Sequence, residues 1–507
     1  MTLCLYRAPF LAAPQILSLK GIVPSVLGKG PCVSIARSHG LGGSSSAGPS
    51  LVHVTMIAAA AAMGGFLFGY DSAVINGAVE AIQQRFGVGA GTLGFVVASA
   101  LLGCVVGAAL AGNLADRLGR IRVMQIAGVL FAASAIGSAL PFSIWDLTFW
   151  RIVGGVAIGL ASVIAPTYIA EVSPANYRGR LASLQQLAIV LGIASSQLVN
   201  YAIAQIAQGS AHNTLGPIQA WQWMLGIELL PALTYFVLSL VIPESPRYLV
   251  RTGKVERARE TLKSVEGGAQ TYVEHRIGEI RRALGSEVRP TLRDLVGRYG
   301  LLPIVWIGMA VSAFQQLVGI NVIFYYSSSL WQSVGIEESD SLLLSLFTSM
   351  VNIVGTVIAI LLVDRVGRKP LLLVGSAGMT LALSLAAYAF ANAGVQADQV
   401  TLAFGWAVVA LIAASSFVLF FALSWGVVVW VLLGEMFPLR IRAAAMGVAT
   451  ATQWLANWLV TVSFPALSDW NLSGTYMMYA AFALLSFMLV WKFVEETKGK
   501  TLEEMQG

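Results

Sequence analysis

Charge is the scarcest property of this sequence. Of its 507 residues, 57% are hydrophobic and only 11% are charged, whereas a soluble domain carries about 25% charged residues. A globule of this size cannot be kept in water by so few charges. Most of the chain must therefore face lipid or other helices. The net charge of +6 does not indicate a nucleic-acid partner, because the basic residues stand in loops between apolar runs and act there as topology signals.

Cysteine is also scarce, and motifs of catalysis are missing. The three cysteines, Cys4, Cys32 and Cys104, have no metal-binding spacing and cannot form a disulfide framework. The sequence contains no Walker A motif, no HExxH and no nucleophile elbow. We therefore expect no enzyme activity, no cofactor and no metal, and an ATP-driven pump is disfavoured for this chain alone.

Acidic residues are absent before Asp71, and residues 1–50 are rich in Ser, Gly and Pro. One interpretation is a targeting peptide, since transit peptides are Ser-rich and poor in acids. The alternatives are a disordered tail or a start codon placed too early. A cleaved secretory signal is less favoured, because the first apolar span can itself direct insertion.

What the chain does contain is a duplication. Asp116-Arg-Leu-Gly-Arg120 recurs as Asp364-Arg-Val-Gly-Arg368, and each copy separates two long apolar stretches. Glu171-Val-Ser-Pro-Ala-Asn-Tyr-Arg178 is echoed by Glu435-Met-Phe-Pro-Leu-Arg-Ile-Arg442. Two related membrane halves with short charged loops are the architecture of a transporter.

Twelve apolar stretches predict an all-α membrane protein with two pseudo-symmetric six-helix bundles. Most stretches exceed the ~20 residues that cross the hydrocarbon core as a helix. The predicted spans are 54–78, 91–113, 122–141, 148–171, 181–205, 219–242, 299–328, 342–364, 370–392, 401–434, 441–466 and 474–494. The predicted domains are a tail (1–50), a first bundle (51–242), a cytoplasmic linker (243–297), a second bundle (298–494) and a cytoplasmic tail (495–507). Short surface helices are expected in the linker at Lys254–Lys263 and Val273–Leu284.

The distribution of basic residues predicts the orientation. One set of loops, with the linker and the C-terminal tail, holds Arg117, Arg120, Arg122, Arg178, Arg180, Arg365, Arg368, Lys369, Arg440, Arg442, Lys498 and Lys500. The opposite set holds one basic residue, Arg85, among the acids Glu80, Asp146, Glu337, Glu338, Asp340, Asp398 and Asp469. The basic side should be cytoplasmic, so both termini should be cytoplasmic in a multi-pass protein of the cell membrane.

Over about residues 54–505, these motifs resemble the sugar porter family of the major facilitator superfamily. The resemblance includes Pro243-Glu-Ser-Pro-Arg-Tyr-Leu249, Gln315-Gln-Leu-Val-Gly-Ile-Asn321, Gln453-Trp-Leu-Ala-Asn457 and Glu496-Thr-Lys-Gly-Lys500. It is nearest to bacterial proton-coupled monosaccharide carriers and to facilitative glucose transporters, and it implies the major facilitator fold.

Three departures from the family pattern stand out. Glu495 replaces the proline expected before Glu-Thr-Lys-Gly, and Ile121 replaces an arginine after Gly-Arg. Val427 replaces the proline expected after Trp425-Gly, which could stiffen a helix that the family bends during transport.

Amide and aromatic side chains within the spans predict a sugar site. A monosaccharide needs groups that both donate and accept hydrogen bonds, which Gln and Asn do, and flat walls for its C–H faces. Gly319 permits a helix break beside three amides, and transporters place substrate at such breaks. The resemblance assigns sugar contacts to Phe68, Gln186, Gln315, Gln316, Asn321, Asn352, Trp430 and Trp454. Gln453 and Asn457 are further candidates, and Tyr325 is a candidate outer gate or a packing residue.

The alternative for these residues is a structural one. Amides can bond helix to helix, and tryptophans can form an interfacial belt. Three clustered amides, Gln315, Gln316 and Asn321, favour a site over helix packing. Trp430 and Trp454 lie inside spans rather than at their ends, which disfavours the belt.

Three ionisable residues fall inside spans. Charge at the bilayer centre costs about 3 kcal/mol or more, so Asp71 should pair with Arg151, with Glu228 as a second acid nearby. Arg stays charged, so Asp71 could titrate as its pairing changes during transport. The resemblance to proton symporters assigns this aspartate the role of proton carrier. The alternative is a static ion pair.

The repeated loop motifs predict an ion network at the cytoplasmic end of each half. The first would use Asp116, Arg117, Arg120, Glu171, Arg178, Glu244 and Arg247. The second would use Asp364, Arg365, Arg368, Glu435, Arg442 and Glu496. We expect these links to hold the two halves together on the cytoplasmic side and to break when that side opens. The alternative is that the charges only enforce topology.

Together these features predict a secondary transporter that moves a hexose or pentose by alternating access. Sugar–proton symport is the first choice because of Asp71, and the chain's partners would be a monosaccharide, a proton and the lipid bilayer, with the protein acting as a monomer. A facilitative uniporter is the alternative. A sugar-sensing receptor is disfavoured by the short segment after the last span, and a drug or phosphate antiporter by the uncharged site.

Overall fold

The computed structural model describes residues 51–174, 177–266, 270–285, 292–297, 300–392, 394–396, 399–438 and 441–498. The predicted tail over 1–50 lies outside these residues, as does the part of the C-terminal tail after 498. The described residues all belong to one compact unit, and the description below concerns that unit alone.

The first half consists of helices and one short hairpin. The hairpin joins strands β1 (Thr214–Leu215) and β2 (Ile218–Gln219), which pair antiparallel. The helices are α1 (Leu51–Val74), the 3-10 turn η1 (Ile75–Gly77), α2 (Val79–Phe86), α3 (Ala90–Leu118), α4 (Arg120–Ala139), α5 (Ile144–Val172), α6 (Arg178–Ile206), α7 (Ala220–Gly226) and α8 (Leu229–Val241).

The linker forms three helices and a short hairpin. These are α9 (Pro246–Arg251), α10 (Val255–Glu266), α11 (Gln270–Gly285), the 3-10 turn η2 (Leu292–Leu295), β3 (Val296–Gly297) and β4 (Gly300–Leu301). The two predicted surface helices correspond to α10 and α11, so that prediction is confirmed. Their apolar faces meet α9 in a small core that includes Leu249, Leu262, Val273 and Ile277.

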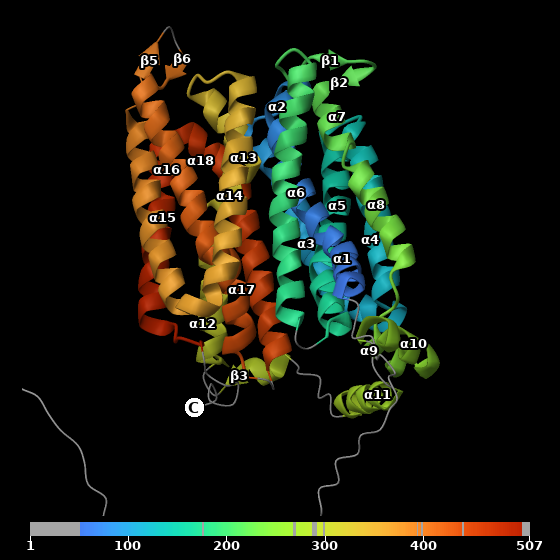
Figure 1. Ribbon diagram of the computed structural model, residues 1–507. Helices are drawn as coiled ribbons and strands as arrows, with labels where there is room; N and C mark the ends of the chain where they lie inside the picture. The colour runs from blue at the N-terminus through green and yellow to red at the C-terminus, as the bar shows by residue number, and fades with distance from the viewer. Residues whose placement is uncertain are drawn as a thin grey trace, which may run out of the picture. The chain divides into compact units, whose positions relative to one another are not determined.

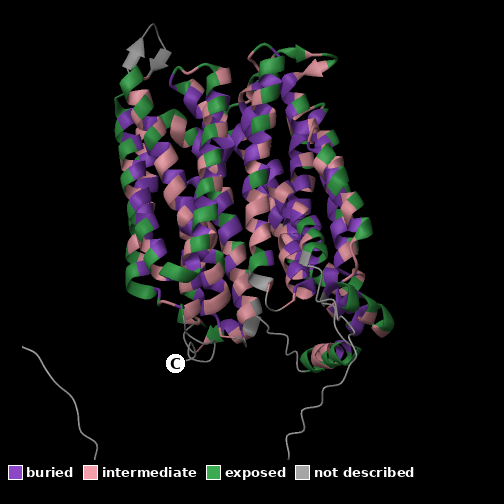
Figure 2. Ribbon diagram, viewed as in Figure 1, coloured by how far each residue is buried: buried purple, intermediate pink, exposed green. Residues whose placement is uncertain are grey.

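The second half repeats the arrangement (Figure 1). Its elements are α12 (Pro303–Leu317), α13 (Ile320–Ser333), α14 (Glu338–Val366), α15 (Arg368–Ala391), β5 (Gly394–Gln396), β6 (Gln399–Thr401), α16 (Phe404–Leu423), α17 (Trp425–Met436) and α18 (Arg442–Phe493). Large apolar side chains such as Leu361 and Leu381 are exposed, and exposed positions recur along the membrane helices (Figure 2), as expected of surfaces that face lipid.

Eleven helices among the described residues are long and apolar enough to cross a membrane. The last of them, Ala444–Phe493, is 50 residues long, roughly 75 Å at the helical rise per residue, and contains two of the predicted spans. Asn471 interrupts it with an extended backbone (φ −162°, ψ 97°), so two helices meet there. The fold prediction of twelve helices in the major facilitator arrangement is confirmed.

Two predicted spans of the second half are broken. Gly319 stands between α12 and α13 with φ +84°, and a Cβ there would lie 2.8 Å from the ring of Tyr479. The predicted break at this glycine is confirmed. Ser424 separates α16 from α17 with a non-helical backbone (φ −133°, ψ −86°). The helix is therefore interrupted even though Val427 replaces the expected proline, because the backbone turns at Ser424.

Small residues let the helices approach closely. A Cβ on Gly155 of α5 would lie 1.9 Å from the Ala100 carbonyl oxygen of α3, and one on Gly107 would lie 2.2 Å from the Val156 carbonyl oxygen. Close packing of this kind holds the helices together. Within a membrane the hydrophobic effect does not drive helix association, because lipid tails are as apolar as the helix surfaces. The two halves meet through α3 against α18 and α6 against α14.

Candidate functional site

The helix break at Gly319 brings three predicted amides together. The Gln315 Nε2 donates to the Trp425 carbonyl oxygen at 2.7 Å, and the Asn321 Nδ2 donates to the Gln316 Oε1 at 2.6 Å. Gln315 is buried, and its Oε1 has no hydrogen-bond partner among the described residues. A buried acceptor without a partner is costly, so this oxygen is suited to accept a ligand hydroxyl.

A second group of polar side chains lies on α18. Gln453 is buried with its Oε1 also unpartnered within the described chain. The Asn457 Oδ1 accepts from the Thr461 hydroxyl at 3.2 Å, and Asn457 and Tyr325 are 4% and 5% exposed. The second half therefore presents amides from both α12–α13 and α18.

An aromatic contact joins the two halves beside these amides. The rings of Phe68 on α1 and Trp454 on α18 have centroids 5.7 Å apart. Trp454 is only 5% exposed, whereas Trp430 on α17 is 38% exposed. Of the two predicted tryptophans, Trp454 is therefore the buried one, and it is the one placed to act as an aromatic wall for a sugar.

The remaining predicted contacts lie on the helices that form the interface. Asn352 is buried on α14, and Gln186 is half-buried on α6. Sequence reasoning missed Gln185, whose buried Oε1 has no partner in the described part of the chain, and Gln197, which is 1% exposed. Amides in an apolar span were the available signal for both.

The ionisable residues of the first half form one buried cluster. The Arg151 Nη1 lies 2.7 Å from the Asp71 Oδ1 and also donates to the Asp71 carbonyl oxygen at 3.2 Å. Glu228, at the junction of α7 and α8, is 3% exposed and lies within hydrogen-bond reach of the Asp71 carboxyl group. The predicted ion pair and its neighbouring acid are therefore present. A Cβ on Gly154 would lie 3.2 Å from the Asp71 Oδ2, so a glycine there leaves room for the cluster.

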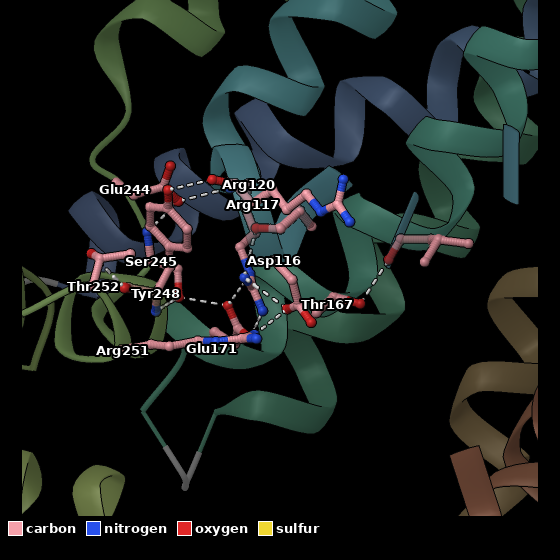
Figure 3. Close-up of polar contacts among 12 residues, drawn as sticks. Asp116, Arg117, Arg120, Thr167, Glu171, Glu244, Ser245, Tyr248, Arg251 and Thr252 are labelled. Atoms are coloured by element: carbon pink, nitrogen blue, oxygen red, sulfur yellow. Dashed lines mark hydrogen bonds and ion pairs between the residues drawn. The ribbon is translucent and has the colours of Figure 1, made fainter. Parts of the chain in front are cut away.

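The first cytoplasmic network is centred on Arg120 (Figure 3). Its guanidinium donates two hydrogen bonds of 2.9 Å to Glu171, one of 3.1 Å to the Ala115 carbonyl oxygen, and lies 3.8 Å from Asp116. Glu244 accepts from the backbone N–H groups of Arg120 and Ile121 at 3.0 and 3.2 Å. Burial raises the pKa of Glu244 above its usual range, although these hydrogen bonds oppose the shift.

The linker adds residues to this network that the sequence did not indicate. The Ser245 hydroxyl donates to Glu171 at 2.5 Å, the Tyr248 hydroxyl to the Arg117 carbonyl oxygen at 3.2 Å, and Arg251 pairs with Asp116 at 2.5 Å. The Arg117 side chain itself is exposed. The side chain of Arg178 lies outside the described residues.

The second network repeats the first around Arg368. The guanidinium donates to Glu435 at 2.8 and 3.0 Å and to Asp364 at 3.1 Å. Glu496 accepts from the backbone of Arg368 and Lys369 at 3.0 Å each. Partial burial would raise the pKa of Glu496, but hydrogen bonds from four backbone N–H groups outweigh it and lower the pKa. Arg442 donates to the Phe437 carbonyl oxygen at 3.1 Å, and the Arg365 side chain is exposed.

The ion pairs described for the two networks each lie within one half, so the expected latch between the halves stays a prediction. Arg120 pairs with Glu171 and Asp116 inside the first half, and Arg368 pairs with Glu435 and Asp364 inside the second. The pairs therefore brace the helix ends of each half. Polar contacts that join the halves occur at the opposite, predicted extracellular end, where Ser328 of α13 bonds Asn76 of η1 and Glu338 of α14 accepts from the Ala211 N–H at 2.7 Å.

Comparison with known proteins agrees with this architecture. The family model described as "Sugar (and other) transporter" matches residues 57–507. A glucose transport protein of Synechocystis sp. is 53% identical over 455 residues, 89% of this chain and 97% of that protein. The D-xylose-proton symporter of Escherichia coli is 38% identical over 488 residues, 90% and 95% of the two chains. A solved structure of the xylose transporter XylE from E. coli in an inward-open conformation shares 36% identity and a TM-score of 0.76, covering 89% of this chain and 99% of that one.

Proposed function

The chain belongs to the sugar transporter family, and on that premise we propose that it carries a monosaccharide across the cell membrane together with a proton. The observation that carries the proposal is the buried cluster of Asp71, Arg151 and Glu228. The glucose and xylose carriers similar to this chain support a hexose or pentose as cargo.

The chemistry of the interface supports a neutral, hydroxyl-rich substrate. The acceptors of Gln315 and Gln453, which have no partner among the described residues, can each receive a hydroxyl hydrogen, and the amide of Asn321 on α13 bonds Gln316, the neighbour of Gln315. The Phe68–Trp454 contact offers an apolar face for sugar C–H groups. Binding between α1 of one half and α18 of the other lets sugar occupancy influence how the halves meet.

The charge balance of the buried cluster supports proton binding. Two carboxyl groups in hydrogen-bond reach of each other and one guanidinium are neutral overall when the pair holds one proton. Loss of that proton leaves a net negative charge in a site that is 3% exposed, which burial strongly disfavours. A conformational change that admits water to the cluster would release the proton, and an inward-negative potential contributes about 2.3 kcal/mol per proton per 100 mV.

The orientation in the plasma membrane follows from the basic residues. The helix ends that carry Arg120 and Arg368 would face the cytoplasm, and both termini would lie on that side. The protein would act as a monomer. The exposed apolar side chains of α14 and α15 would contact lipid.

The test is uptake of labelled glucose and xylose by liposomes that contain the purified protein. Symport predicts accumulation above the outside concentration under an inward proton gradient, and its collapse when a protonophore is added. Asp71→Asn should abolish accumulation while sugar exchange across the membrane persists. Uptake that only equilibrates, with or without the protonophore, would establish a uniporter in which Asp71 and Arg151 form a static pair.

A further inference from the structure

The indole of Trp425 starts a chain of hydrogen bonds through the second half. Its Nε1 donates to the Ser376 hydroxyl at 2.9 Å and lies 3.2 Å from the Leu372 carbonyl oxygen, both on α15. The hydroxyl oxygens of Ser376 and Ser486 are 2.8 Å apart, and the Ser486 hydroxyl donates to the Ala483 carbonyl oxygen at 2.7 Å. Trp425, Ser376 and Ser486 are fully buried. One dry polar chain therefore joins α17, α15 and α18.

The direction of each bond in this chain follows from counting hydrogens. A serine hydroxyl has one hydrogen to donate and an oxygen that accepts. The hydrogen of Ser486 goes to the Ala483 carbonyl oxygen, so Ser376 is the donor between the two serines. The Ser376 oxygen then accepts from the Trp425 indole, which can only donate. Every donor of the chain has a partner, so the chain holds the indole in one position.

The backbone beside this indole turns out of the helix. Ser424 has φ −133° and ψ −86°, and α17 begins at Trp425. The first N–H groups of a helix lack partners within that helix, so main-chain bonds hold its first residue less firmly than its interior. A Cβ on Gly375 of α15 would collide with the Ser424 hydroxyl, so glycine lets the turn approach α15. The indole chain therefore fixes the start of α17 at a turn where Val427 replaces the family's proline.

The backbone carbonyl of Trp425 connects this chain to the proposed sugar site. It accepts from the Gln315 Nε2 at 2.7 Å. Because a carbonyl oxygen can only accept, the Gln315 side chain must turn its NH₂ group toward Trp425. The Gln315 Oε1 has no partner among the described residues, and the residue is 2% exposed. Gln315 therefore presents an acceptor, and the position of the Trp425 backbone sets where that acceptor points.

We propose that Trp425 is a positioning residue for substrate binding. Its indole holds the carbonyl that orients Gln315, and the Gln315 Oε1 then selects a sugar hydroxyl that donates its hydrogen. This inference rests on the proposed function, because it assumes that a sugar binds at Gln315. A site built to receive a hydrogen rejects an analogue that lacks it, since the buried acceptor is then left unpaired.

Equilibrium binding to the purified protein tests the selection of a donor. The probes are glucose and xylose, with the monodeoxy and monodeoxyfluoro analogues of the sugar that binds more tightly. Fluorine replaces a hydroxyl but has no hydrogen to donate. At the hydroxyl that Gln315 receives, both analogues should bind about tenfold more weakly than the parent sugar. This difference should disappear in Gln315→Ala.

Two failures of this experiment are distinct. Binding of neither glucose nor xylose by the native protein would overturn the proposed function and this inference with it. If a sugar binds, but fluorine replaces without loss every hydroxyl whose removal is sensitive to Gln315→Ala, the donor selection alone is overturned.

Trp425→Phe tests the positioning role, because it keeps an aromatic ring and removes the indole N–H. Binding of the parent sugar should weaken about tenfold. The weakening should be absent for the analogue without the donor hydroxyl, and absent in the Gln315→Ala background, since the contact that Trp425 positions is already lost there. Ser376→Ala should show the same pattern at about threefold, because the indole keeps the Leu372 carbonyl oxygen. It leaves the tryptophan in place, so it provides the comparison even where Trp425→Phe does not fold.

Trp221→Phe is the matched control. Trp221 is 2% exposed and its indole donates to the Gln219 Oε1 at 2.9 Å, so this variant also removes an indole bond of a buried tryptophan. Trp221 lies on α7 of the first half, whereas Gln315 lies in the second, so sugar binding should be unchanged. A merely structural role of Trp425 would weaken the binding of every analogue by one common factor. That result, or an equal effect of Trp221→Phe, would overturn the positioning role.

Discussion

The two cytoplasmic networks use equivalent residues in equivalent positions, yet their surroundings differ. The Glu171 side chain is 11% exposed and its counterpart Glu435 is 31% exposed. Asp116 is 34% exposed, whereas Asp364 is 81% exposed. The duplicated sequence therefore produces the same bonds in two different dielectric environments.

The cause of the difference is what covers each network. In the first half, α9 lies over it, with the Tyr248 ring 5.9 Å from the Arg120 guanidinium and Arg251 bonded to Asp116 (Figure 3). In the second half, the cover described is the short segment with Glu496, Thr497 and Lys498. The opposite pKa shifts of Glu244 and Glu496 follow from this cover, because burial dominates in one and backbone hydrogen bonds in the other.

The largest effects should come from the central arginines. Arg120→Ala leaves Glu171 without its guanidinium partner in a largely buried site and should lower the free energy of unfolding by about 3 kcal/mol or more. Arg368→Ala should cost less, about 2 kcal/mol, because water can solvate Glu435 and Asp364. Thermal unfolding in detergent measures both.

Exposed arginines of the same motifs provide the controls. Arg117→Ala and Arg365→Ala should leave the unfolding temperature unchanged, since both side chains are exposed. Equal losses for Arg120→Ala and Arg368→Ala would show that the cover of α9 has no energetic consequence.

The hydroxyl groups that bond the network glutamates should have intermediate effects. Ser245→Ala removes a 2.5 Å bond to Glu171 and the N-cap of α9, whose Tyr248 N–H bonds the same hydroxyl. Thr497→Val removes only the 2.5 Å bond to Glu435. We expect losses of about 2 kcal/mol and about 1 kcal/mol in the free energy of unfolding. A larger loss for Thr497→Val than for Ser245→Ala would show that the second network, not the first, contributes more to the free energy of unfolding.

The two network glutamates should give opposite pH dependences. The pKa of Glu244 is raised on folding, so its contribution is present at low pH and is lost as pH rises through its folded-state pKa. The pKa of Glu496 is lowered, so its contribution is present above the unfolded-state pKa and is lost as pH falls through the folded-state value.

Unfolding temperatures measured from about pH 4 to about pH 7 test this prediction against Glu244→Gln and Glu496→Gln. The difference between native protein and variant should fall with rising pH for Glu244 and increase for Glu496, by on the order of 1 °C. Parallel trends would contradict the assignment of burial as the dominant cause in the first half.

The smallest effects should come from the outermost contacts. Arg251→Ala removes a pair whose side chains are each about one-third exposed, and Lys498→Ala removes an exposed bond to the Arg365 carbonyl oxygen at 2.6 Å. Each should change the free energy of unfolding by less than about 0.5 kcal/mol. A clearly larger loss for Arg251→Ala would show that this contact anchors α9 to the membrane half.

Several features of the site were predictable because they depend on local chemistry. Asp71 and Arg151 stand inside apolar spans, where each charge needs a partner, and they pair at 2.7 Å. Gly319 between amides predicted a break, because glycine adopts the positive φ that the turn requires.

Other features depended on how the helices assemble. Asn76 and Ser328 lie in different halves and far apart in sequence, and nothing in either segment indicates the other. Arg120 pairs with Glu171 and Arg368 pairs with Glu435, in each case across neighbouring helices of one half, and the packing of those helices selects these partners. Ser245, Tyr248 and Arg251 became network residues only because α9 folds back beneath α3.

By itself, the sequence determined the number of spans, the duplication, the helix break at Gly319 and the residues that required partners. Helical hydrogen bonds, span length and the cost of charge in lipid act locally, so a linear pattern reveals them. The tertiary structure alone decided which end of the carrier is joined and which network is covered. Those outcomes depend on packing between helices that are distant in sequence, where a shift of one turn exchanges one partner for another.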